Sequence, residues 1–268
     1  MEMDDVKKRA FVACPFDMLM DKGYLDLAIE MGINLEIGLN GDILSRFPFY
    51  SFYQVSERFK QAGLRCSVHA PFIDISLGAF DPVIRQVCVN RIGDAIDIAV
   101  LFRATNVVIH TGFVPLVFGE IRQVWLENFI ASMKTVVQHA TDAGISLMIE
   151  NVFEKGPALH QEIFSCFDEI SNLGFCLDIG HVMAFSQTSL SEWLDAVGLR
   201  TGHLHLHDNH GGTDEHLAIG EGKGDFDYLF AWLADRDIHP VITIEAHDRE
   251  KVLPSFEALA RLLDRYGI

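Results

Sequence analysis

Basic residues are scarce in this chain of 268 residues, which has 21 lysines and arginines against 38 aspartates and glutamates. The formal charge of −17 disfavours broad, sequence-independent binding of DNA, because such binding relies on cationic side chains that neutralise phosphates. Long apolar runs are absent too: stretches such as residues 95–102 contain a charge and are far shorter than the ~18 residues of a membrane span. The polar N-terminal segment lacks the apolar core of an export signal, so we expect a cytoplasmic protein.

Cysteine is sparse and shows no pairing pattern. The five cysteines form no C-x-x-C motif, and Cys14, Cys66 and Cys176 fall in apolar runs that we expect to be strands. We therefore expect reduced thiols in the core, where cysteine acts as a small hydrophobic residue. The G-x-S-x-G motif of many serine hydrolases and the H-E-x-x-H motif of zinc proteases are both missing.

The chain does contain a regular alternation of short apolar runs with longer helical segments. The apolar runs predict eight strands, at residues 10–14, 33–37, 65–69, 106–110, 145–150, 175–178, 202–207 and 241–245. The helical segments that follow them cover residues 18–31, 49–62, 83–103, 120–143, 158–171, 190–197, 226–235 and 254–266. Because such apolar strands are typical of parallel sheets covered by helices, the series predicts a (β/α)8 TIM barrel with residues 1–268 as a single domain.

Glycines mark several boundaries between these elements. Gly32, Gly63, Gly144 and Gly174 stand at helix-to-strand turns, as expected of residues that end helices. The rival fold is an open, doubly wound sheet, which normally carries a glycine-rich phosphate loop after an early strand. The first turn reads CPFDML without glycine, and GEGKG at residues 220–224 comes late in the chain, so we prefer the barrel.

Side chains that bind divalent metals stand at or near the ends of successive predicted strands. They are His69, His110, Glu150, Asp178, His205 and Glu245, with His181 shortly after Asp178 and with Asp214 and His216 in a later loop. In a (β/α)8 barrel the C-terminal strand ends meet at one rim, where catalytic residues lie. Acids and imidazoles gathered there would repel and desolvate one another without a cation. The series predicts a metal site, and the mixed donors favour Zn²⁺, Mn²⁺, Co²⁺ or Fe²⁺ over Ca²⁺ or Mg²⁺.

The HLHLH run at residues 203–207 places its histidines on one face of the seventh strand. We expect His203 to be buried and hydrogen-bonded below the metal site, and His207 to lie nearest the loop, where it could touch substrate. Phe72 could form part of a pocket wall, and Lys223 could meet a phosphate. Each of these residues alone is as readily explained by packing or by solvation.

The motifs together resemble the xylose isomerase-like TIM-barrel superfamily, which joins sugar and sugar phosphate isomerases and epimerases with AP endonucleases of the endonuclease IV type (AP endonuclease family 2). The segments that carry the resemblance are SVHAPF, VVIHTGF, LMIENVFE, CLDIGHVMAF, HLHLHDNHGGTDEHLAIGEGKGDFDY and ITIEAHD. For the isomerases and epimerases it implies one metal held by Glu150, Asp178, His205 and Glu245. For endonuclease IV it implies three zinc ions with further ligands at His69, His110, His181, Asp214 and His216.

Details of these motifs favour the isomerase and epimerase branch. Endonuclease IV typically has Thr-Cys where this chain has Ile179-Gly180, and it has a tyrosine where this chain has Phe72. The loop after the second strand contributes Arg46 as its only cation, whereas endonuclease IV uses such loops to grip and bend DNA. We therefore expect a small sugar as the partner rather than nucleic acid.

Three hypotheses follow from the resemblance. The first is an isomerase or epimerase of a sugar or sugar phosphate, in carbohydrate metabolism, with a Zn²⁺, Mn²⁺ or Co²⁺ ion that stabilises an enediolate. In it Glu150 and Glu245 would be the acid and base, and the substrate would be bound by His181, His207, Lys223 and Phe72. The second is a zinc phosphodiesterase with up to three ions and Glu150 as a bridging ligand. The third is a non-catalytic relative that binds a sugar or a partner protein. Each of the three hypotheses allows either a monomer or a homodimer.

Overall fold

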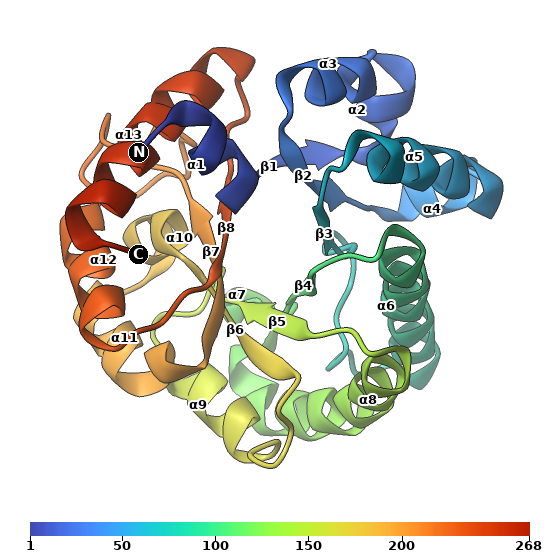
Figure 1. Cartoon of the computed structure of the whole chain (residues 1–268). Coiled ribbons are helices and arrows are strands. Elements are labelled where there is room, and N and C mark those ends of the chain that lie inside the picture. The colour runs from blue at the N-terminus through green and yellow to red at the C-terminus, as the bar shows by residue number, and fades with distance from the viewer.

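Eight parallel strands close into a barrel in the computed structural model, which describes residues 1–268 (Figure 1). The strands are β1 (Ala10–Pro15), β2 (Asn34–Gly38), β3 (Cys66–His69), β4 (Val107–His110), β5 (Leu147–Glu150), β6 (Leu173–Asp178), β7 (Thr201–Leu206) and β8 (Val241–Ile244). Each strand pairs with the next in sequence, and β8 pairs with β1. The predicted (β/α)8 barrel is therefore confirmed.

The helices surround the barrel as an outer layer (Figure 1). They are α1 (Met3–Arg9), α2 (Phe16–Asp21), α3 (Tyr24–Met31), α4 (Gly41–Arg46), α5 (Phe49–Ala62), α6 (Pro82–Phe102), α7 (Pro115–Phe118), α8 (Arg122–Ala143), α9 (Ala158–Ser165), α10 (Ile179–Phe185), α11 (Leu190–Val197), α12 (Phe226–Asp235) and α13 (Val252–Tyr266). Short 3-10 turns cover Gly119–Ile121, Gly198–Arg200 and Arg249–Lys251. No helix combines the length and the apolar character that crossing a membrane requires.

Several predicted boundaries agree with the structure. The helices predicted at residues 49–62, 190–197 and 226–235 have those bounds as α5, α11 and α12. Gly32 and Gly63 end α3 and α5 in the left-handed region, with φ of 65° and 69°. A residue with a Cβ would be strained there, which is why glycine signals these helix ends in the sequence.

Three details of the prediction were wrong. The segment predicted as one helix at residues 18–31 is two helices, because the chain turns at Gly23 with a φ of 72°. Gly174 lies within β6 and ends no helix; a Cβ there would meet the Met148 sulfur at 2.8 Å and the Arg200 carbonyl oxygen at 3.0 Å. That glycine allows neighbouring chain segments to approach closely. The helix predicted at residues 158–171 ends at Ser165, where the chain enters turns.

The core lies between the barrel and the helices. A continuous cluster of 68 buried hydrophobic residues fills this space. The barrel interior is polar by contrast: Ser67 and Thr243 donate hydrogen bonds to the carboxylate of Glu36, and Thr243 also bonds to His203. This polar layer lies directly beneath the rim where the predicted metal donors stand.

Candidate metal centre

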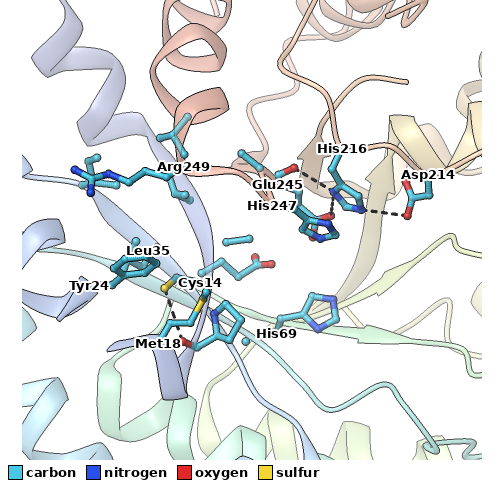
Figure 2. A pocket seen from close by; sticks show the side chains of 18 of the residues that line it. Cys14, Met18, Tyr24, Leu35, His69, Asp214, His216, Glu245, His247 and Arg249 are labelled. Atoms are coloured by element: carbon cyan, nitrogen blue, oxygen red, sulfur yellow. Dashed lines mark hydrogen bonds and ion pairs between the residues drawn. The ribbon is translucent and has the colours of Figure 1, made fainter. Parts of the chain in front are cut away.

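The predicted donor residues converge at the C-terminal rim of the barrel. The last residues of β3, β4, β5 and β6 are His69, His110, Glu150 and Asp178. His205 lies one residue before the end of β7, level with Asp178 in the strand register, and Glu245 follows β8 directly. The barrel therefore brings together residues that lie far apart in the sequence, and Figure 2 shows part of this rim.

Glu150 lies at the middle of the group, with imidazoles at both of its carboxylate oxygens. Its Oε2 atom is 3.2 Å from Nε2 of His69 and 3.0 Å from Nε2 of His110. Its Oε1 atom is 3.1 Å from Nδ1 of His181 and 3.4 Å from Nδ1 of His205. Only 1% of the Glu150 side chain is exposed, so this carboxylate depends on these neighbours for compensation of its charge.

Three carboxylates surround the Nδ1 atom of His205. The distances from this atom are 3.1 Å to Oε1 of Glu245, 3.4 Å to Oε1 of Glu150 and 3.9 Å to Oδ2 of Asp178. The nitrogen is buried and makes no hydrogen bond. The four residues that the resemblance implies as ligands of one metal are thus grouped around a single unpartnered atom.

A second group of donors adjoins the first around Asp214. Its Oδ2 atom lies 3.4 Å from Nε2 of His181 and 3.1 Å from Nε2 of His216, and its Oδ1 atom lies 3.7 Å from Nε2 of His207. His207 links the two groups, because its Nε2 atom is also 3.1 Å from the Asp178 carboxylate. Figure 2 shows the ion pair between Asp214 and His216.

The hydrogen bonds of three imidazoles leave nitrogen lone pairs facing carboxylates. In His69, His181 and His216 the Nδ1 atom lies 2.9–3.1 Å from a backbone carbonyl oxygen. Because a carbonyl can only accept, Nδ1 carries the proton, and Nε2 of the neutral ring is an acceptor. Each Nε2 nevertheless faces a carboxylate oxygen, a contact that a cation between the two atoms would make favourable. Metal-binding histidines show this same arrangement.

The electrostatics of the site favour positive charge at its centre. Burial raises the pKa of Glu150, but the neighbouring His205 and His110 outweigh burial and hold this pKa well below its usual range. Burial lowers the pKa of His181, but the Asp178 charge and the hydrogen bonds that His181 donates to Asp214 and Glu150 outweigh it and raise this pKa well above its usual value. The Glu150 carboxylate therefore remains ionised and requires a compensating charge, either protons or a metal.

Donor atoms in the site fit a divalent metal. Triplets of donor atoms that lie within 4.8 Å of one another are His69–Glu150–His205, Asp178–His205–Glu245, Asp178–His181–His207, His207–Asp214–His216 and Glu36–His203–His205. Their carboxylate and imidazole composition suits Zn²⁺ and similar ions. Because several triplets adjoin one another, the site has enough donors for more than one ion.

Glu36 belongs to this site and was missed by the sequence analysis. It lies in β2 with 1% of its side chain exposed, and its Oε1 atom is 3.0 Å from Nε2 of His205. Its Oε2 atom is 3.2 Å from Nε2 of His203 and accepts the hydrogen bonds of the polar layer below the rim. The signal was present, because Glu36 is the only charged residue of its strand.

The histidines of β7 and of the segment after it play different parts. His203 is buried and hydrogen-bonded to Asn106 and Thr243, as expected. His207 is fully buried against Asp178, so it stands among the donors instead of facing open space. Its ring passes over Gly180, where a Cβ would lie 2.0 Å from Cε1 of His207.

Asp208 keeps the GEGKG loop in place. The backbone amides of Gly220, Gly222 and Gly224 donate hydrogen bonds of 2.8–3.0 Å to its buried carboxylate. These amides are therefore bound to an internal anion and are not available to a phosphate. Lys223 is exposed and is absent from the lining of the cavity at the metal centre.

Several of the predicted donors, among them Glu150, His181 and Glu245, line a cavity of about 660 Å³, whereas Asp178 and His205 lie behind this lining. Phe72 also lines it and stacks on His110, with ring centroids 4.6 Å apart. Two lining residues that the sequence analysis did not anticipate are His247 and Arg249, in the segment after β8. The ring of His247 stacks on that of His216, with ring centroids 3.6 Å apart, so it extends the row of imidazoles along the cavity wall (Figure 2).

Comparisons with known sequences identify a family. The family described as xylose isomerase-like TIM barrel matches residues 25–266. An uncharacterized protein of Methanocaldococcus jannaschii is 33% identical over 204 residues, which are 74% of this chain and 69% of that protein. A probable endonuclease 4 of Malacoplasma penetrans is 27% identical over 186 residues, which are 62% of this chain and 61% of that protein.

Solved structures show the same fold. A D-tagatose 3-epimerase-like protein superposes with a TM-score of 0.76 at 29% identity, covering 87% of this chain and 89% of the other. A protein of Thermus thermophilus soaked with ZnCl2 superposes with a TM-score of 0.76 at 27% identity, covering 94% of this chain and 98% of the other. Both similarities extend over most of the barrel.

Proposed function

The chain belongs to the xylose isomerase-like TIM-barrel family, and on this basis we propose that it is a metal-dependent isomerase or epimerase of a sugar. The observation that carries the proposal is the grouping of Glu150, Asp178 and Glu245 around Nδ1 of His205, at 3.1–3.9 Å. The similarity to a D-tagatose 3-epimerase-like protein supports a sugar as the substrate.

The four grouped residues would hold the metal, and the orphaned Nδ1 atom of His205 would be one of its ligands. Zn²⁺, Mn²⁺ and Co²⁺ all suit this set of donors. The similarity to a protein soaked with ZnCl2 makes zinc the first ion to test. When bound, a divalent metal polarises a substrate carbonyl and makes the hydrogen on the neighbouring carbon more acidic.

Glu150 and Glu245 would move the proton. Both line the cavity, but 14% of the Glu245 side chain is exposed against 1% for Glu150. Glu245 would therefore reach a bound sugar from the open side, and Glu150 from the deeper side. Return of the proton to the opposite face of the same carbon gives epimerisation, and return to the adjacent carbon gives isomerisation.

Hydrogen exchange tests this proposal directly. Protein loaded with Zn²⁺, Mn²⁺ or Co²⁺ is incubated in D₂O with D-fructose, D-tagatose and D-fructose 6-phosphate, and NMR follows deuterium at the carbon beside the carbonyl. We expect deuterium to enter at least one of these sugars. This exchange should stop after the metal is chelated and resume when metal is added again. Exchange that persists in fully stripped protein, or exchange of no sugar with any metal, would contradict the proposal.

A zinc phosphodiesterase resembling endonuclease IV is the second candidate. The specific observation in its favour is that the Glu150 carboxylate faces His69 and His110 at one oxygen and His181 at the other, as a bridging ligand would. The relation to a probable endonuclease 4 agrees with it. Against it, Arg46, the last residue of α4 and the only cation between β2 and α5, is paired with Asp21 at 2.5 Å.

Metal content and DNA cleavage separate the two candidates. Elemental analysis of the purified protein with three zinc ions per chain, together with cleavage of a duplex that contains an abasic site, would favour the phosphodiesterase. A single ion per chain and an intact duplex would favour the isomerase or epimerase.

A further inference from the structure

The cavity at the metal centre continues beyond the barrel into an apolar compartment. This compartment is lined by Cys14, Tyr24, Leu27, Met31, Leu35 and Leu253. Figure 2 shows Cys14, Tyr24 and Leu35 on one side of the cavity and the metal donors His216 and Asp214 on the other. The lining thus changes from apolar to strongly polar within one continuous space.

The strand pairing explains how the two parts connect. β8 pairs with β1 only at Ala10–Val12, whereas β1 continues to Pro15 and pairs with β2 along its remaining length. Beyond Val12 the edge of β1 that faces β8 is therefore unpaired. Ala13 and Pro15 from this stretch line the cavity, so an opening with small side chains lies beside the metal centre.

The helix α3 presents an apolar stripe to this compartment. Tyr24, Leu27, Ala28 and Met31 all line the cavity and have the spacing of one helix face. Such a stripe is normally buried against the core, but Tyr24, Leu27 and Met31 are only partly buried here. In Figure 1, α3 and α13 are separated from each other in the helical layer. Residues of both helices line the apolar compartment.

We propose that the apolar compartment binds an aryl or alkyl group attached to the sugar, so that the substrate class is a glycoside with an apolar aglycone whose sugar also carries a carbonyl group. This inference rests on the proposed function, because the metal centre would bind the sugar part. A cavity of about 660 Å³ lies in the range that encloses drug-sized ligands, which exceed a single sugar in size. Arg249 is the only lysine or arginine in the lining, so the compartment offers apolar contact and no cluster of cations for a phosphate.

Binding of two matched glycosides tests the proposal. Calorimetry on the zinc-loaded protein compares phenyl β-D-glucopyranoside with methyl β-D-glucopyranoside, which share the sugar and differ in the aglycone. Neither compound has a carbonyl, so both report binding without turnover. We expect the phenyl compound to bind about tenfold more tightly or better, because burial of the ring removes apolar surface from water. Equal affinities, or no measurable binding of the phenyl compound, would overturn the proposal.

Variants locate the preference in the compartment. Leu27→Trp fills the compartment from α3. Met31→Trp fills it from the same helix face and serves as the second variant if circular dichroism shows that the first is not folded. In either folded variant we expect the ratio of the phenyl to the methyl glycoside affinity to fall below about twofold, with methyl glycoside binding retained. Leu199→Trp is the matched control, because Leu199 is 77% exposed and outside the cavity; it should keep the wild-type preference. A preference that survives both cavity variants would also overturn the proposal.

The two proposals can fail separately. Exchange of deuterium into a free ketose without any preference for the phenyl glycoside would reject the apolar aglycone and leave the proposed function standing. A phenyl preference that Leu27→Trp removes, in a protein that exchanges no ketose with any metal, would reject the reaction and leave the binding compartment standing.

Discussion

The Oε1 atom of Glu36 lies 3.0 Å from Nε2 of His205, and both side chains are almost completely buried. The contact is an ion pair, and neither atom has a hydrogen-bond partner. A carboxylate on the Nε2 side of this ring favours a proton there, which leaves the Nδ1 lone pair directed at Glu245, Glu150 and Asp178. Glu36 is thus placed to orient, from the barrel interior, the histidine that we propose as a metal ligand.

Replacing Glu36 should weaken metal binding without removing a ligand. We expect Glu36→Gln to lower the affinity for Zn²⁺ about 10- to 100-fold, the range seen when such supporting partners are changed. Titration against a competing chromophoric chelator measures this. Glu169→Gln, at an exposed position, is the control. An unchanged zinc affinity in a folded Glu36→Gln protein would show that Glu36 does not act through His205.

The position of the His207 ring should depend on the absence of a side chain at Gly180. We expect Gly180→Ala to displace His207 from Asp178, because a Cβ would lie 2.0 Å from its ring. Crowding of this kind typically destabilises a protein by about 1–3 kcal/mol, which thermal unfolding measures. Gly119→Ala is a suitable control: no atom lies within 4 Å of its Cβ position, and its backbone is helical. Equal melting temperatures for the two variants would contradict this expectation.

The two glutamates should both be needed for proton transfer. We expect Glu245→Gln and Glu150→Gln each to lower the rate of deuterium exchange about 10²- to 10⁴-fold, the usual contribution of a general acid or base. Glu150→Gln should also weaken metal binding more, because the Glu150 carboxylate contacts four imidazoles. Near-normal exchange in either variant, with circular dichroism showing an intact fold, would reject the two-glutamate mechanism.

Thiol labelling should depend strongly on the folded state. Burial, with a smaller effect of Asp17, raises the pKa of Cys14 to about 12 from an ordinary 9.0, so its reactive thiolate is rare at pH 8. Cys166 is exposed, and we expect it alone to react quickly with Ellman's reagent, with all five cysteines reacting in urea. Cys166→Ser should abolish the fast phase. Rapid modification of Cys14 in the native protein, detected by mass spectrometry, would contradict the buried position.

The pKa of Cys14 also predicts the direction of an alkaline effect on stability. Because the pKa is higher in the folded state, the stability associated with the neutral thiol is present below pH 9 and is lost as the pH rises toward 12. The midpoint of urea unfolding should therefore fall more in the wild type than in Cys14→Ala over this range. An equal fall in both proteins would show that Cys14 does not contribute.

The sequence by itself determined the barrel architecture and most of the residues that meet at its C-terminal rim. Alternating strands and helices are local patterns, and glycines such as Gly32 and Gly63 reveal helix ends through a backbone conformation that other residues rarely adopt. Residues at strand ends, including Glu150 and Asp178, could be expected to meet because parallel strands in a closed barrel share one C-terminal rim.

Only the tertiary structure decided which side chains support the metal donors and where the cavity leads. The contact of Glu36 with His205 joins strands that are not neighbours in the barrel, so no local pattern predicts it. The glycine-rich loop gives only a weak phosphate signal in the sequence, and only the structure shows that Asp208 binds its amides. The apolar compartment depends on the short pairing of β8 with β1 and on the separation of α3 from α13, which arise from packing over the whole barrel.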